Sequence, residues 1–202
     1  MAKLKIALLG AGGNTIDIFE QLKEFTEYET LGYFNNSEDY LIKNFTDLNY
    51  LGTEADLDMS SLDGLIITFA GIGRTIASRK AAFEKYKQRA LSLFFKESLI
   101  SKYSQISKKG VIIFGSTVVK SFTNIEDNVF INSGAIIGHH VNIKRNCVIS
   151  LGVIIGGKSI IEEEVFIGMG ARIFQGVKIG KCSIIGSGVN VRKDLPPNSK
   201  IL

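Results

Sequence analysis

Residues 131–155 read INSGAIIGHHVNIKRNCVISLGVII, and an isoleucine stands at every sixth position of this stretch. The spacing extends in both directions, so a β-branched aliphatic residue occupies the same slot in fourteen consecutive hexads from Ile113 to Val191. Four positions after nearly every one of them stands a small or β-branched residue, such as Ala135 or Val141. A helix repeats every 3.6 residues and a strand every 2, so neither explains a fixed slot at every sixth residue.

A parallel β-solenoid of triangular cross-section explains this period, because three hexads form three flat faces and one coil takes eighteen residues. Four glycines at intervals of eighteen support this coil length, and we expect them along one edge where a positive φ or a close approach is needed: Gly134, Gly152, Gly170 and Gly188. Fourteen hexads make nearly five coils, and parallel pairing spaces neighbouring coils roughly 4.8 Å apart. We expect Pro196 and Pro197 to end the ladder, since proline donates no hydrogen bond.

The first half of the chain predicts a small α/β domain. An apolar strand at residues 4–9 leads into a glycine-rich turn, and an amphipathic helix follows. Further strands are expected near residues 29–34, 64–70 and 90–95, with a helix over 74–86. The expected organisation is therefore an α/β domain at 1–96, a linker at 97–107 and the solenoid at 108–202.

The glycine-rich turn is incomplete as a dinucleotide fingerprint, because Thr15 occupies the position of the third glycine. A NAD site would also want an acidic residue at the end of the second strand, where this sequence has Asn35 and Asn36. NAD is therefore disfavoured, and the size of the domain suits a nucleotide sugar better.

Composition limits the remaining classes. The 202 residues are 45% hydrophobic and include two cysteines, which excludes disorder and a disulfide scaffold. No run of about eighteen apolar residues predicts a membrane span, and the N-terminus does not resemble a secretory signal, so we expect a soluble cytoplasmic protein. Residues 1–100 hold 11 Lys/Arg and 14 Asp/Glu, while residues 101–202 hold 13 and 6. The cations of the second half are scattered singly, which disfavours nucleic acid and suits a small phosphorylated partner.

Several segments carry a resemblance to a known family. The hexads IGHHVN, IGMGAR, IGKCSI and IGSGVN resemble the left-handed parallel β-helix of the hexapeptide-repeat acyltransferases. Together with GAGGN at 10–14, FAGIGRTIASR at 69–79 and FKESLIS at 95–101, they make the whole chain similar to one bacterial group. This group is the nucleotide-sugar acyltransferases, which includes sialic acid O-acetyltransferase and UDP-4-amino-sugar N-acetyltransferase.

The resemblance implies a Rossmann-like domain that binds a nucleotide-linked sugar, and a β-helix that binds acetyl-CoA between neighbouring subunits of a homotrimer, without a metal. It places the general base at His139, with Asn132 helping to position the acceptor. His140 joins this catalytic set, since it stands where amino-sugar members often carry the Glu that follows the base. The acetyl-CoA site falls on Gly157, Lys158, Arg172 and Lys178. The nucleotide-sugar site falls on Gly10, Gly12, Gly13, Asn14, Asn35, Asn36, Gly71 and Gly73.

The repeat and the implied roles can be compared directly. Gly157 lies eighteen residues after His139, so we expect its backbone amide roughly 5 Å away on the next coil, where it could stabilise an oxyanion. Direct transfer of acetyl from acetyl-CoA to the amine of a nucleotide-linked 4-amino sugar is the favoured reaction.

Three other interpretations apply to the same sequence. O-acetylation of a sialic-type sugar and a non-catalytic β-helix scaffold remain alternatives. A γ-type carbonic anhydrase is disfavoured, because His139 and His140 are the only histidines and adjacent residues cannot complete a three-histidine zinc site. Cys147 falls in an inward slot and is expected to pack in the core, and Cys182 is out of register with it.

Overall fold

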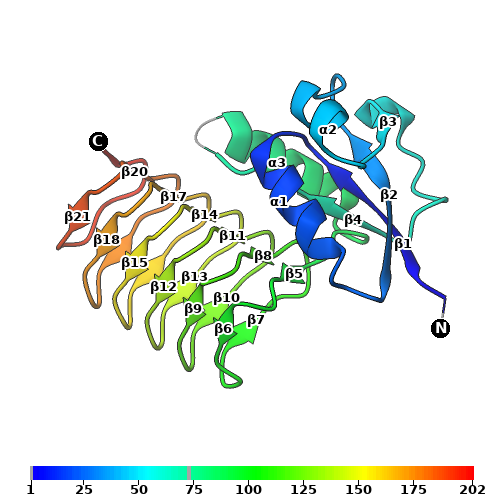
Figure 1. Cartoon of the computed structure of the whole chain (residues 1–202). Helices are drawn as coiled ribbons and strands as arrows, with labels where there is room; N and C mark the ends of the chain where they lie inside the picture. The colour runs from blue at the N-terminus through cyan, green and yellow to red at the C-terminus, as the bar shows by residue number, and fades with distance from the viewer. Residues whose placement is uncertain (1, 72–73) are drawn as a thin grey trace.

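A computed structural model describes residues 2–71 and 74–202. It consists of an α/β part followed by a long parallel β-helix (Figure 1). None of the helices in the described residues is long and apolar enough to cross a membrane.

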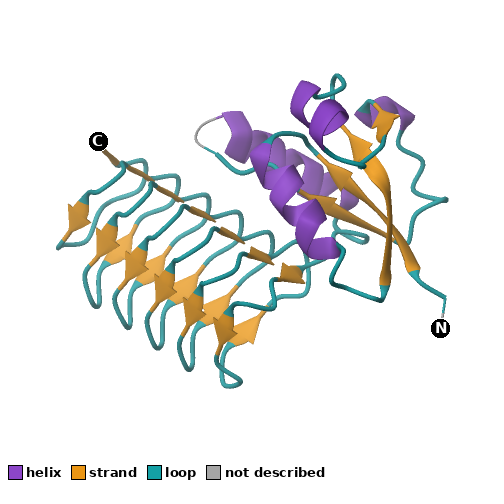
Figure 2. Cartoon of the chain, viewed as in Figure 1, coloured by secondary structure: helices purple, strands orange, loops and turns teal. Residues whose placement is uncertain are grey.

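The α/β part is built on a four-stranded parallel sheet in the order β3-β2-β1-β4. Its strands are β1 (Leu4–Leu9), β2 (Tyr28–Phe34), β3 (Tyr50–Gly52) and β4 (Gly64–Ile67). Its helices are α1 (Gly13–Leu22), α2 (Tyr40–Phe45), the 3-10 turn η1 (Glu54–Asp56) and α3 (Arg74–Tyr86). The helices flank the sheet in Figure 2.

The two faces of this sheet are buried in two separate cores. Ile6 and Leu8 of β1 pack with Ile18 of α1, and this cluster continues into the β-helix through Phe114 and Phe130. The alternate residues of β1 pack on the other face with α3. Because side chains alternate across a strand, the buried residues 6–9 of β1 form a continuous apolar run that serves both cores.

The β-helix has three flat parallel sheets, which we call the first, second and third faces. The first face comprises β5 (Leu93–Phe94), β8 (Ile112–Ile113), β11 (Phe130–Ile131), β14 (Val148–Ile149), β17 (Phe166–Ile167), β20 (Ile184–Ile185) and β22 (Lys200–Ile201). The second comprises β6 (Leu99–Ile100), β9 (Val118–Val119), β12 (Ile136–Ile137), β15 (Ile154–Ile155), β18 (Arg172–Ile173) and β21 (Asn190–Val191). The third comprises β7 (Gln105–Ile106), β10 (Asn124–Ile125), β13 (Asn142–Ile143), β16 (Ile160–Ile161) and β19 (Lys178–Ile179).

The eighteen-residue coil is confirmed by the strand register. Ile137 pairs with Ile155 on the second face, and Ile143 pairs with Ile161 on the third. The aliphatic slot and the small slot both point inward and form one continuous core. The four predicted edge glycines all have positive φ, between 63° and 72°.

The structure corrects the predicted linker at 97–107. This segment contains β6 and β7, which pair with β9 and β10 as part of the first coil. The hexad count stopped at Ile113 because seven residues, not six, separate it from the preceding inward residue, Ile106. One inserted residue therefore breaks the six-residue spacing, and the first coil could not be recognised from it.

Two further expectations at the ends of the β-helix were wrong. The strand expected near 90–95 is not the last strand of the α/β sheet: Ala90 makes only a bridge to Leu65, and β5 already pairs with β8. At the other end, Pro196 and Pro197 do not end the ladder. β22 follows them and pairs with β20, because the prolines occupy a corner, where their missing N–H groups cost no ladder hydrogen bond.

Candidate active site

The two histidines lie at the corner between β12 on the second face and β13 on the third. His140 holds the positive φ of this corner, at 59°, and its N–H donates to the Ser121 carbonyl of the preceding coil at 3.1 Å. The His139 carbonyl accepts from the N–H of Lys158 on the next coil at 2.9 Å. The coils on both sides thus fix the backbone of the corner, while both imidazoles are exposed.

The imidazole of His139 lies directly against the backbone of Gly157. A Cβ atom at Gly157 would come within 2.8 Å of both Nε2 and Cε1 of His139, so this close approach requires glycine. No hydrogen-bond acceptor for the Gly157 N–H occurs among the described residues. The structure therefore brings together a ring nitrogen and an unpaired amide, the two groups that the eighteen-residue spacing predicted side by side.

The two imidazoles contact one another. Nδ1 of His139 lies 3.0 Å from Nδ1 of His140, and the rings meet edge to face. His140 also packs on the ring of Phe122, with centroids 5.0 Å apart, and Phe122 stacks on Tyr103 at 5.9 Å. No sequence motif singled out this aromatic column, although Phe122 stands eighteen residues before His140 and occupies the same corner.

Asn132 does not lie beside His139 in the folded chain. It follows β11 at the corner between the first and second faces, so the whole width of the second face separates it from the histidine corner. Its Oδ1 accepts from the Ser133 N–H at 2.8 Å.

Asn132 instead lines a cleft of about 250 Å³ together with Gly71, which leads into α3. The cleft thus joins one predicted catalytic residue to one predicted nucleotide-sugar residue. Its other walls are mainly apolar and include Phe166 and Met169, which no sequence motif singled out.

The turn between β1 and α1 is built on glycine for steric reasons. Gly10 has φ of 120°, and a Cβ there would collide with Oγ1 of Thr68. Gly12 has φ of 101° and caps α1 without any side-chain hydrogen bond to the helix N-terminus. Gly13 and Asn14 form the first turn of α1, so their N–H groups face the open end of the helix, a place that favours an anion.

A second cavity of about 300 Å³ opens at the carboxyl ends of the parallel strands, the edge where such sheets bind ligands. Asn35 and Asn36 line it from the end of β2, and Ser78 lines it from α3. At its rim the Glu54 carboxylate accepts from Lys85 Nζ at 2.8 Å and from the Tyr86 hydroxyl at 3.0 Å. The hydrogen bond from Lys85 lowers the pKa of the Glu54 carboxyl. Gly73 lies outside the described residues.

The cations predicted to meet coenzyme A are not gathered at one point. Lys158 is exposed at the corner of the next coil above His140. Arg172 lies on the second face, and Lys178 lies on the third, where its Nζ pairs with Glu162 at 2.9 Å. Lys158 is therefore the only one of the three on the same edge as the histidines.

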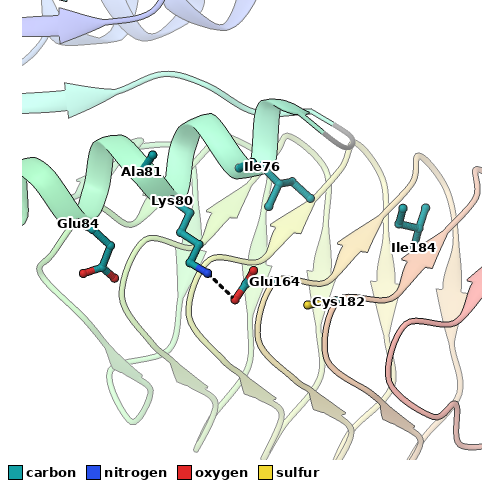
Figure 3. Close-up of a pocket in the computed structure, with 8 residues that line it drawn as sticks. Ile76, Lys80, Ala81, Glu84, Glu164, Cys182 and Ile184 are labelled. Carbon is teal, nitrogen blue, oxygen red and sulfur yellow. Dashed lines mark hydrogen bonds and ion pairs between the residues drawn. The ribbon is translucent and has the colours of Figure 1, made fainter.

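A groove of about 380 Å³ separates α3 from the later coils and is shown in Figure 3. Lys80 of α3 spans it to Glu164 with an Nζ–Oε1 distance of 3.0 Å. Ile76, Cys182 and Ile184 also line it. None of the site residues implied by the resemblance lines this groove, so it is not the candidate site.

Of the two cysteines, Cys147 lacks the setting of a nucleophile. Both are free, and Cys147 is fully buried, which raises the pKa of its thiol to about 12. A thiol with that pKa is almost wholly protonated at neutral pH. Covalent catalysis through Cys147 is therefore unfavourable.

Comparison with solved structures gives the same architecture over nearly the whole chain. The acetyltransferase domain of PglB from Neisseria gonorrhoeae is 22% identical with a TM-score of 0.81, and the match covers 98% of this chain and 96% of that one. A histidine-to-alanine variant of GDP-perosamine N-acetyltransferase from Caulobacter crescentus, in complex with CoA and GDP-perosamine, is 23% identical with a TM-score of 0.81 and coverages of 98% and 95%. The chain has the fold of these acetyltransferases.

A third solved structure is more distant. WeeI from Acinetobacter baumannii is 18% identical with a TM-score of 0.63, and the match covers 96% of this chain and 94% of that one. No family model matches this sequence, and no sequence among curated proteins is significantly similar to it.

Proposed function

We propose that the protein is an acetyl-CoA-dependent N-acetyltransferase that acts on a nucleotide-linked 4-amino sugar. The observation that carries the proposal is the contact between the His139 imidazole and the Gly157 backbone, on a β-helix of the same fold as a perosamine N-acetyltransferase. An imidazole and an unpaired amide at one place supply the two functions that acyl transfer needs, a general base and an oxyanion donor.

The reaction follows from these two groups. Nε2 of His139 takes a proton from the amine of the acceptor as the amine attacks the thioester carbon of acetyl-CoA. The carbonyl oxygen becomes an oxyanion, which the Gly157 N–H stabilises. The tetrahedral intermediate then collapses, the carbon–sulfur bond breaks, and the leaving coenzyme A thiolate takes the proton from Nε2 of His139. No acyl-enzyme forms in this direct transfer.

Binding of the donor is assigned to the β-helix. Lys158 lies on the same edge as His139, and we assign it to the phosphates of coenzyme A. Arg172 and Lys178 flank the next corner of this edge from the second and third faces. Their charge favours an anionic ligand along the edge.

Binding of the acceptor is assigned to the α/β part, which we infer to be Rossmann-like. The open N-terminus of α1, formed by Gly12, Gly13 and Asn14, suits the diphosphate, with Gly10 holding the turn. Asn35 and Asn36 line a cavity whose position suits the nucleobase of the acceptor. Gly71 and Asn132 line a cleft that would take the sugar.

A complete site then needs more than one chain. Asn132 and His139 stand at opposite edges of the second face. One chain therefore cannot bring its sugar cleft to its own general base, His139. We therefore infer a homotrimer of left-handed β-helices, in which His139 of one subunit meets the sugar cleft of its neighbour.

The test is release of the coenzyme A thiol from acetyl-CoA in the presence of UDP- and GDP-linked 4-amino sugars. Turnover with at least one amine acceptor, and its loss in His139→Ala, is expected. Asn190→Ala on the far end of the second face is the matched control and should retain activity. Turnover with hydroxyl acceptors alone would assign O-acetylation instead, and no binding of coenzyme A by calorimetry would leave a non-catalytic scaffold.

A further inference from the structure

The contact between the two histidines constrains where their protons lie. Nδ1 of His139 and Nδ1 of His140 are 3.0 Å apart, which is hydrogen-bond distance. A bond between two ring nitrogens holds one proton, so one ring is the donor at Nδ1 and the other presents a lone pair there.

Only one of the two arrangements suits the chemistry proposed above. If His139 donates from Nδ1, its Nε2 carries the lone pair, and this is the nitrogen that lies against Gly157. If His140 donated instead, neutral His139 would carry its proton on Nε2 and could not act as a base there. The productive arrangement therefore has His140 as the acceptor at Nδ1.

The surroundings of His140 hold its ring in place although it is exposed. Its backbone is fixed in the left-handed region by the hydrogen bond to the Ser121 carbonyl. Its ring packs against Phe122, which in turn stacks on Tyr103. Neither aromatic ring is buried, so their contribution here is to limit the rotation of His140.

We infer that His140 is a positioning residue, which accepts a hydrogen bond from Nδ1–H of His139 and so fixes the base in the tautomer with a free Nε2. This inference rests on the proposed function for its catalytic meaning, but the hydrogen bond can be tested without any substrate. His140 thus performs with a neutral ring the orienting task for which a carboxylate is usual beside a catalytic histidine.

The experiment is ¹⁵N NMR of the imidazole nitrogens in the full-length protein. The chain has only two histidines, so each variant at position 140 leaves the signals of His139 alone. In the unsubstituted protein we expect neutral His139 to carry its proton on Nδ1. His140→Leu removes the acceptor but keeps a side chain of similar bulk against Phe122, and should return His139 to the Nε2–H tautomer.

The matched variant is His140→Asn. Asparagine tolerates the left-handed region and can present its Oδ1 near the place of the ring Nδ1, so it should keep the proton of His139 on Nδ1. If turnover is established, kcat should fall about tenfold or more in His140→Leu with KM for acetyl-CoA unchanged, and return to within about threefold in His140→Asn.

The outcomes separate the two proposals. An Nε2–H tautomer of His139 in the unsubstituted protein, or one tautomer in all three proteins, would overturn the role of His140. The expected tautomers without turnover on any acceptor would instead remove the proposed function and leave the hydrogen bond established. Thermal unfolding of each variant shows whether it is folded. If His140→Leu does not fold, the tautomer of His139 in His140→Asn and in the unsubstituted protein still tests the inference.

Discussion

The guanidinium of Arg79 in α3 donates from Nε to the backbone carbonyl of Asn128 in the β-helix at 3.3 Å. The same side chain donates to the carbonyls of Gly110, Ile67 and Phe69, and it is 1% exposed. Burial lowers the pKa of this guanidinium, and no carboxylate pairs with it among the described residues. Four carbonyl dipoles therefore hold a buried cation at the junction between the α/β part and the β-helix.

Arg79→Met should be strongly destabilising, because it leaves four carbonyl oxygens without a donor in a buried place. We expect the free energy of unfolding to fall by about 3 kcal/mol in urea titrations. Lys80→Met is the matched control, since it removes a half-exposed ion pair one residue away and should cost under about 1 kcal/mol. Equal losses in the two variants would contradict a special role for the buried guanidinium.

Gly157→Ala should impair catalysis while leaving the fold intact. The new Cβ would push the His139 ring away from the amide, and displacing the base from the oxyanion donor should lower kcat by about 100-fold. The measurement is steady-state kinetics with acetyl-CoA. Gly115→Ala, where a Cβ meets nothing closer than 3.4 Å, should keep normal kinetics. Normal kinetics in Gly157→Ala as well would show that the contact has no catalytic role.

Mixed assemblies should test the site between subunits. His139→Ala and Asn132→Ala should each be nearly inactive alone. If each site takes His139 from one subunit and Asn132 from its neighbour, one of the three interfaces in every mixed trimer has both residues, so the isolated mixed trimers should recover about a third of full activity. Co-expression with two different affinity tags isolates the mixed oligomers for assay. An absence of any recovery in confirmed mixed trimers would place both residues of a site in one chain.

The two thiols should differ in reactivity. Burial raises the pKa of Cys147 to about 12, so at pH 8 its thiolate fraction is negligible and alkylation should be slow until the chain unfolds. Cys182, partly exposed beside the groove under α3, should react first in a mass-spectrometric time course with iodoacetamide. Cys147→Ala should retain kcat and lower the free energy of unfolding by about 1 kcal/mol, since it removes only a small buried group. A large loss of kcat would reopen the question of thiol chemistry.

The repeat predicts most of the fold, because an inward aliphatic side chain at every sixth residue is a direct consequence of the coil. The prediction failed where that regularity breaks. The extra residue between Ile106 and Ile113 interrupts the six-residue spacing, so the first coil was not predicted. Pro196 was expected to end the ladder, whereas it stands in a corner. Local rules describe a strand or a turn, whereas the place of a residue in the coil depends on every insertion before it.

The candidate site was predictable only where the spacing fixes it. His139 and Gly157 meet because eighteen residues make one coil. Asn132 stands only seven residues before His139, yet a corner and a face intervene. The partners of His140 and the apolar walls of the cleft at Gly71 depend on side-chain packing, which a period does not encode.

The coil length also sets what changes in chain length the molecule can accept. Removing eighteen residues beyond Lys158 would shorten the rod and leave every remaining side chain on its own face. Removing six would preserve the hexad pattern yet turn everything downstream onto the adjacent face. Insertions and deletions in this chain should therefore be tolerated in whole coils, or at corners as bulges such as the extra residue before Ile113, and a change of one hexad should be far more damaging than its small size suggests.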